Sequence, residues 1–219
     1  MSDETEDPRV SRAVAGDEAA MAELFEEHRE RLKRMIELRL NPRLHGRVDA
    51  SDVLQEAYVD LAKQLKSYSE NPAIPFFIWL RRITGQRLIM VHRKHLGTAK
   101  RDAKMEVNLA RNSTPEASSV FLASHLVGQL TTVSQRVMRD ERQEKLREVL
   151  ENLDKDDREI IALRHFEHLT IAEIASLYDV TEAAAGMRHL RALRKMKKYL
   201  GQLPDLFDSI AGFGDVRGD

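Results

Sequence analysis

The chain has 219 residues, in which 35 lysines and arginines are balanced by 36 aspartates and glutamates, and it contains no cysteine. This balance argues against a uniformly basic nucleic-acid coat protein, and the missing thiols exclude disulfides and thiolate metal sites. Charged residues make up 32% and aromatic residues 5%, with no alternating strand pattern, so we predict an all-α protein with two small helical domains joined by a flexible linker.

Charge is segregated along the chain. Residues 81–104 and 188–198 are strongly basic, whereas residues 1–7 and 140–160 lean acidic. Local basic segments on a balanced chain are typical of a protein that contacts nucleic acid through limited surfaces. The N-terminus is acidic, and no segment approaches the roughly 20 apolar residues that span a bilayer, so we expect a cytoplasmic protein.

Apolar residues recur at helical spacing through the first 40 residues, with a break at Gly16-Asp17 that predicts one or two helices. Residues 41–46 contain asparagine, proline and glycine, which favour a turn. Asp49 or Ser51 is placed to cap the next predicted helix, over residues 52–68.

A second predicted helix, over residues 76–95, follows a loop with two prolines and carries the only tryptophan of the chain. Its apolar residues share one broad face, which predicts a core contact. Arg82, Gln86 and Arg93 point away from that face, and Trp79 lies at its border. A cationic strip with one aromatic suits a single-stranded nucleic acid, although a border tryptophan is more often a packing residue.

Periodicity weakens after His95, and this change predicts the domain limits. The predicted division is an acidic tail over 1–9, a helical domain over 10–97, a linker over 98–139, a second helical domain over 140–200 and an acidic tail over 201–219. Residues 119–139 contain scattered apolar positions that would suit a further helix.

Residues 169–200 have the spacing of a helix-turn-helix. Thr170 with Glu173 predicts a capping box, Asp179 stands where the turn needs a left-handed residue, and Thr181 caps the second helix. One side of that helix would face phosphates and base edges and is basic: Arg188, Arg191, Lys195 and Lys198. The other side would face the preceding helices and is apolar: Leu190, Leu193, Met196 and Leu200.

The segments "SDVLQEAYVDL", "FFIWLRRITGQRLIMVHRK" and "LENLDKDDREIIALRHFEHLTIAEIASLYDVTEAAAGMRHLRALRKMKK", in this order, resemble an RNA polymerase sigma factor. The similarity is to the compact extracytoplasmic-function type of the sigma-70 superfamily, and it extends from about residue 10 to about residue 200. No single motif is decisive, and the order of the two blocks makes the resemblance specific.

The resemblance implies roles for the first block. The residues implied to dock on the clamp helices of the largest polymerase subunit are Asp52, Gln55 and Glu56. The loop residues implied to capture a flipped base of the minus-ten element are Tyr68, Ser69, Glu70 and Asn71. The helix implied to follow the melted DNA contributes Trp79, Arg82, Gln86 and Arg93.

The resemblance also implies that the helix-turn-helix reads the minus-thirty-five element, with Arg188 and Arg191 at positions where the family uses basic residues. The full set of contacts predicted there is Thr181, Ala184, Met187, Arg188, Arg191 and Lys195. Two departures matter. Arg82 and Ile83 stand where housekeeping sigma factors have adjacent tryptophans, which predicts stricter promoters. Gly186 occupies a recognition-helix position that is often basic.

The expected partners are therefore core RNA polymerase and promoter DNA. Many relatives are also held by an anti-sigma factor, which is a further partner that the resemblance suggests. No cofactor, bound metal or catalytic residue is expected. His92 with His95, and His165 with His168, have a spacing that could share a metal, but neither pair has a placed carboxylate partner, and surface histidines near DNA are the default interpretation.

The sequence is also compatible with three other classes of protein, each of which explains it less well. A helix-turn-helix regulator that never meets polymerase would leave the Asp52, Gln55 and Glu56 face without a role. An enzyme is disfavoured because the chain has no glycine-rich phosphate loop and no nucleophile elbow. An anti-sigma or adaptor protein would not need the basic recognition helix.

Overall fold

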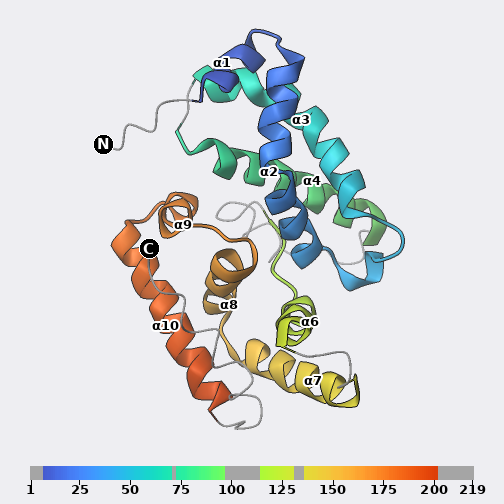
Figure 1. Cartoon of the computed structure of the whole chain (residues 1–219), viewed down its shortest axis with the longest axis vertical. Coiled ribbons are helices and arrows are strands. Elements are labelled where there is room, and N and C mark those ends of the chain that lie inside the picture. Colours follow the sequence, from blue (N-terminus) through green and yellow to red (C-terminus); the bar gives the residue numbers. More distant parts are fainter. Residues whose placement is uncertain (1–6, 71–72, 97–113, 131–135, 202–219) are drawn as a thin grey trace. The chain divides into compact units, whose positions relative to one another are not determined.

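The computed structural model describes residues 7–70, 73–96, 114–130 and 136–201, and side chains are not described for residues 128–139. All regular structure in these ranges is helical, which confirms the predicted all-α class (Figure 1). The elements are α1 (Pro8–Val14), α2 (Glu18–Arg39), η1 (Pro42–Leu44), α3 (Ala50–Glu70), α4 (Phe76–Leu96), α6 (Ser119–Leu130), α7 (Arg136–Asn152), α8 (Lys155–Ile161), η2 (Ala162–Phe166), α9 (Ile171–Tyr178) and α10 (Glu182–Leu200).

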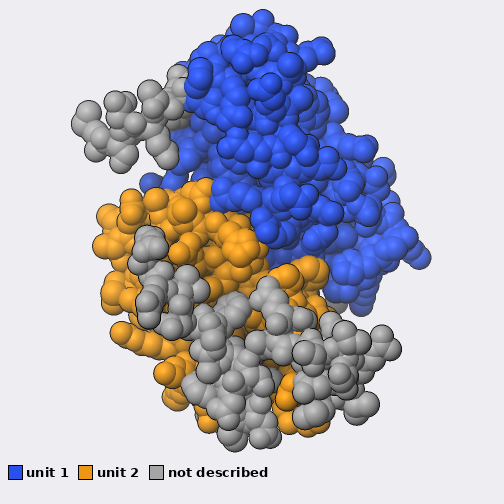
Figure 2. Space-filling model, viewed as in Figure 1, with its two compact units in different colours: residues 1–115, 176–179 blue, residues 116–175, 180–219 orange. Residues whose placement is uncertain are grey.

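The chain forms two compact units, coloured separately in Figure 2. Unit 1 comprises residues 1–115 and 176–179, and unit 2 comprises residues 116–175 and 180–219. Within the described helices, none is long and apolar enough to cross a membrane.

Unit 1 is built from α1 to α4, in which α2 packs on α3 and on α4, and α3 packs on α4. The break predicted at Gly16-Asp17 is confirmed, because Gly16 has a φ of 96° and the Asp17 carboxylate accepts the Ala20 amide at 3.0 Å. Each long helix turns its apolar stripe inward, and side chains that are at most 1% exposed form the core: Leu24, Leu32, Met35, Ile36, Val53, Leu54, Leu61, Leu80 and Leu88.

Unit 2 is built from two packed pairs, α6 with α7 and α8 with α10. Helix α6 lies inside the stretch that the sequence assigns to a linker, so that part of the stretch is folded. It is held in unit 2 by buried apolar side chains at helical spacing, Leu122, Ala123, Leu126 and Val127. Residues 97–113 lie outside the described residues, as does all of the predicted tail over 201–219 except Gly201.

Candidate polymerase and nucleic-acid interfaces

The outer face of α3 carries the residues predicted to bind polymerase, since Asp52, Gln55 and Glu56 are all exposed. The start of the helix is fixed by Asp49, whose carboxylate accepts the Ser51 amide at 2.7 Å. In return, the Asp49 amide donates to the Asp52 carboxylate at 3.4 Å. This reciprocal cap fixes the first turn of α3 and so positions the exposed face.

Arg87 links this face of α3 to α4. Its guanidinium donates to Asp60 and, at 3.4 Å, to Glu56. Arg87 therefore belongs to the helix–helix contact, and Arg81 is only 1% exposed. Among the arginines of α4, the ones that reach the surface are Arg82 and Arg93. Gln86 lies between them and is half-buried, so the predicted cationic strip exists but is narrower than the sequence suggests.

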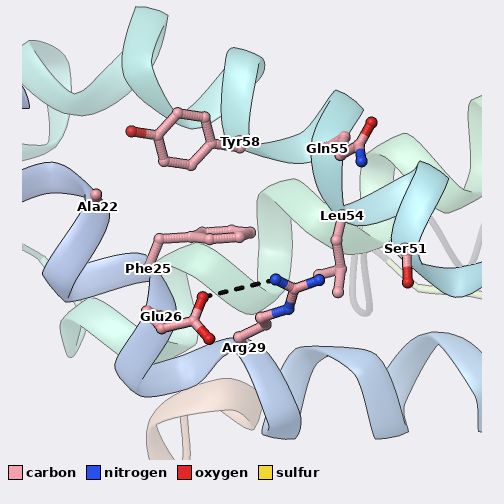
Figure 3. A pocket seen from close by; sticks show the side chains of 8 residues that line it. All are labelled: Ala22, Phe25, Glu26, Arg29, Ser51, Leu54, Gln55 and Tyr58. Carbon is pink, nitrogen blue, oxygen red and sulfur yellow. Dashed lines mark ion pairs between the residues drawn. The ribbon is translucent and has the colours of Figure 1, made fainter.

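A groove of about 300 Å³ lies between α2 and α3 (Figure 3). Phe25 and Tyr58 meet there edge to face, with ring centroids 5.1 Å apart. An ion pair between Arg29 and Glu26, at 3.6 Å, borders the same groove. The full lining is Ala22, Phe25, Glu26, Arg29, Ser51, Leu54, Gln55 and Tyr58. Gln55 thus belongs both to this groove and to the predicted polymerase face.

The end of α3 corrects one prediction. The predicted helix ends at Tyr68, and Ser69 and Glu70 are predicted to lie in the loop, but α3 continues through Glu70. It does so because Tyr68 has apolar partners: its ring is 9% exposed and lies 4.8 Å from the Trp79 ring and 5.5 Å from the Phe76 ring. Its hydroxyl donates to the Ile74 carbonyl at 3.1 Å.

The remaining residues of this predicted set are placed as follows. The Ser69 hydroxyl donates to the Lys66 carbonyl at 2.9 Å, Glu70 is exposed, and Asn71 lies outside the described residues. Trp79 is half-buried in the cluster with Tyr68 and Phe76, which agrees with a border position on α4. An entering base would have to displace part of this aromatic cluster to stack on Tyr68.

The helix-turn-helix has the local geometry that the sequence predicts. The Thr170 hydroxyl accepts the Glu173 amide at 3.1 Å, and the Glu173 carboxylate accepts the Thr170 amide at 2.8 Å. Asp179 adopts a left-handed φ of 52° in the turn. The Thr181 hydroxyl then accepts the Ala184 amide at 3.2 Å and starts α10.

Helix α10 has one buried face and one exposed face, and their positions correct another prediction. Leu190 was expected on the buried side but is 46% exposed. The buried side is formed by small and large apolar residues that share one face of the helix: Ala185, Ala192, Met196 and Leu200. Because successive residues of an α-helix advance by about 100°, Leu190 lies about 160° around the helix from Ala192 and so points away from the buried side.

The exposed face of α10 carries Met187, Arg188, Leu190, Arg191 and Arg194. Thr181 is exposed but engaged as the cap, and Ala184 is half-buried one turn later. Arg194 was not among the predicted contacts, although counting helical positions from the Thr181 cap places it one turn beyond Arg191 on the same face.

Lys195 is held by carboxylates at the start of α8. Its ammonium donates to Asp154 at 2.6 Å and also pairs with Asp157. Hydrogen bonding from Lys195 lowers the pKa of Asp154, and both carboxylates raise the pKa of Lys195. The Asp154 side chain also caps α8 by accepting the Asp157 amide at 3.0 Å. A DNA contact by Lys195 would require these surface ion pairs to break, and such pairs contribute little individually.

The default prediction of surface histidines is wrong for His92, and His165 is half-buried. His92 is 4% exposed, and its Nε2 accepts the Asn41 amide at 3.2 Å. His165, in η2, and His189, in α10, place their Nε2 atoms 2.9 Å apart, so one ring donates and the other accepts. Burial lowers the pKa of His92 to about 4, and burial followed by nearby positive groups lowers the pKa of His165 to about 4.

These contacts give the first histidine of each possible metal-binding pair, His92–His95 and His165–His168, a partner within the fold. In each pair the first histidine is engaged within the fold, His92 with Asn41 and His165 with His189. Within the described residues, no group of three or more histidine, aspartate or glutamate side chains is arranged to hold a metal ion.

Two family models match the chain in the predicted order. Residues 24–97 match sigma-70 region 2, and residues 143–196 match sigma-70 region 4; together they cover more than half of the chain. The chain belongs to the sigma-70 family of RNA polymerase sigma factors, as the sequence resemblance implied. Region 2 lies within unit 1, and most of region 4 lies within unit 2.

Among the solved structures with a similar fold is that of CnrH in complex with the cytosolic domain of CnrY, at 19% sequence identity and a TM-score of 0.51. The match covers 89% of this chain and 96% of that chain, so the likeness in fold extends over most of both chains. No curated protein matches the sequence.

Proposed function

We propose that this sigma factor directs core RNA polymerase to promoters with two elements, with unit 1 recognising and melting the minus-ten element and the helix-turn-helix reading the minus-thirty-five element. The observation that carries the proposal is the pairing of region 2 and region 4 with an exposed arginine face on α10. Arginine in a major groove suits guanine edges, and the outer arginines of α10 are free of any core role.

The proposed polymerase contact is the outer face of α3. Asp52, Gln55 and Glu56 are exposed on one rigid, capped helix, as a surface that binds another helix requires. The reciprocal cap through Asp49 fixes Asp52, and Arg87 fixes Glu56 from the neighbouring helix. The proposed partner is the pair of clamp helices in the largest subunit.

The proposed minus-ten contact combines the exposed Arg82 and Arg93, the half-buried Gln86 and the aromatic cluster at the end of α3. Unstacking a base costs a few kcal/mol, which a pocket for that base must offset. Tyr68 and Trp79 supply aromatic faces for this purpose once the cluster opens. Ser69, Glu70 and Asn71 are proposed to line the entry to that pocket.

Transcription in vitro tests the proposal, with core polymerase, this protein and a library of promoter fragments read by start-site sequencing. Discrete new start sites that share two spaced elements are expected. Replacing Asp52, Gln55 and Glu56 together by alanine should abolish all starts, whereas Arg188→Ala with Arg191→Ala should remove only dependence on the upstream element. Sequence-specific binding to duplex DNA without any new start would instead support the regulator that does not bind polymerase.

We also propose that a protein inhibitor holds this sigma factor. The observation behind it is that CnrH, with a similar fold, is seen in complex with the cytosolic domain of CnrY. A partner of this kind should compete with core polymerase. Co-purification of the tagged chain from its own cells, followed by displacement with added core polymerase, tests this; a partner that stays bound to the holoenzyme would contradict it.

A further inference from the structure

The exposed face of α10 contains two large apolar side chains. Met187 is 51% exposed and Leu190 is 46% exposed. They lie one turn apart on the helix, and an exposed arginine follows each of them by four residues, Arg191 after Met187 and Arg194 after Leu190. A basic helix that only follows phosphates gains nothing from apolar side chains placed among its arginines.

The core of unit 2 does not use these two side chains. The buried face of α10 consists of Ala185, Ala192, Met196 and Leu200, each at most 5% exposed. Single exposed apolar residues are common on protein surfaces. Two adjacent ones beside exposed arginines mark an interaction site, and its ligand would offer both negative charge and apolar groups.

Duplex DNA is the ligand that satisfies both requirements. The arginines complement the phosphates, and the major groove offers one exposed apolar group, the C5-methyl of thymine. A protein partner with acidic residues around an apolar centre would also meet both requirements. The position of both residues in the first half of α10, directly after the Thr181 cap, favours DNA because recognition helices contact base edges with their N-terminal residues.

Resting on the proposed function, we infer that Met187 and Leu190 recognise thymine methyl groups in the minus-thirty-five element, next to a guanine bound by Arg188 or Arg191. Residues three apart on an α-helix are separated by about 4.5 Å along its axis, which is close to the roughly 3.4 Å step between bases. The two thymines should therefore be adjacent or one step apart. The residues that set sequence preference then include Leu190 as well as the arginines.

Replacing thymine by uracil in the DNA removes the methyl group and leaves every hydrogen-bonding group in place. The holoenzyme is assembled with the full chain and tested on its best promoter, with each upstream thymidine replaced in turn by deoxyuridine. Loss of one buried methyl group should weaken binding about fourfold at one or two positions. Met187→Ala and Leu190→Ala should each remove the uracil penalty at one of those positions.

Val120→Ala is the matched control, because Val120 is an exposed apolar residue of α6, at 43% exposure, on a different helix of unit 2. This variant should keep the full uracil penalty. Normal starts with no uracil penalty at any thymine would overturn the inference and leave the proposed function intact. Unchanged sequence preference together with weaker polymerase binding in Leu190→Ala would overturn it in favour of a protein-docking surface. Absence of any promoter-specific start would overturn the proposed function itself.

Discussion

Acidification from pH 7 to pH 5 is expected to destabilise unit 2 through the contact between His165 and His189. Burial, then the nearby His189, Arg164 and His168, lower the pKa of His165 from 6.5 to about 4. Burial, then Arg164, lowers the pKa of His189 as well. Both rings are therefore neutral when folded at pH 7, and one donates its N–H to the other across 2.9 Å.

The sign follows from where the protons bind. Unfolded His165 takes up a proton near pH 6.5, whereas folded His165 takes it up only near pH 4. The free energy of unfolding is therefore highest above pH 6.5 and falls as the pH drops from about 6.5 to about 4. Between pH 7 and pH 5 the loss from His165 alone is about 2 kcal/mol, and His189 adds to it in the same direction.

Hydrogen exchange of the α10 amides measures the free energy of unfolding of unit 2 at each pH, because the slowest-exchanging amides exchange only when the unit opens. His165→Gln keeps a polar side chain facing His189 and removes the titratable group. Between pH 7 and pH 5 the free energy of unfolding of this variant should therefore fall by about 2 kcal/mol less than that of the wild type. Fluorescence of Trp79, the only tryptophan of the chain, follows unit 1 and should not distinguish the two proteins. Equal losses in α10 for the wild type and His165→Gln would refute the reasoning.

Three further outcomes follow from the structure. Ala22→Phe should fill the groove beside Gln55 and weaken core-polymerase binding about tenfold in a fluorescence titration. Ala15→Phe, at an exposed position outside the groove, should leave binding unchanged, and equal effects of the two variants would contradict a role for the groove. Gly186→Ala should raise the free energy of unfolding by about 0.5–1 kcal/mol in urea denaturation, because an added Cβ meets nothing within 4 Å; a lower value would count against it. Thr181→Ala should lower it by about 1 kcal/mol, and Thr181→Ser should restore it.

Short-range features of the fold could be predicted from the sequence. The capping box at Thr170 and Glu173, the left-handed Asp179 and the cap at Thr181 each depend on residues within three or four positions, and all are confirmed. The break at Gly16-Asp17 belongs to the same kind. Local hydrogen-bond chemistry decides these positions, so the sequence contains the whole cause.

Features set by packing between helices could not be predicted in this way. Arg81 was placed in a cationic segment but is 1% exposed, and Arg87 from the same segment pairs with Asp60, 27 residues away. His165 and His189 meet across 24 residues of sequence. The buried face of α10 includes Ala185 and Ala192, whereas Leu190 is exposed, so a face chosen by its large apolar residues is the wrong one at Leu190.

The residues of the candidate site could be predicted in two different ways, from helical periodicity and from the family resemblance. The exposure of Arg82, Arg93, Arg188 and Arg191 agrees with the faces that helical periodicity predicted. The roles of Asp52, Gln55 and Glu56 came from resemblance alone, because three polar residues on a solvated helix do not specify a partner by their chemistry. Their assignment stays a prediction until polymerase binding is measured.

The division of α10 into a buried seam and an outer face has a consequence for how such a protein changes over time. The seam of Ala185, Ala192, Met196 and Leu200 anchors the helix, and the outer side chains contribute nothing to that anchor. Substitutions at the outer positions should therefore change the stability of the fold very little. Under the proposed role of this face in reading DNA, new promoter preferences could arise by single substitutions, without a compensating mutation elsewhere in the unit.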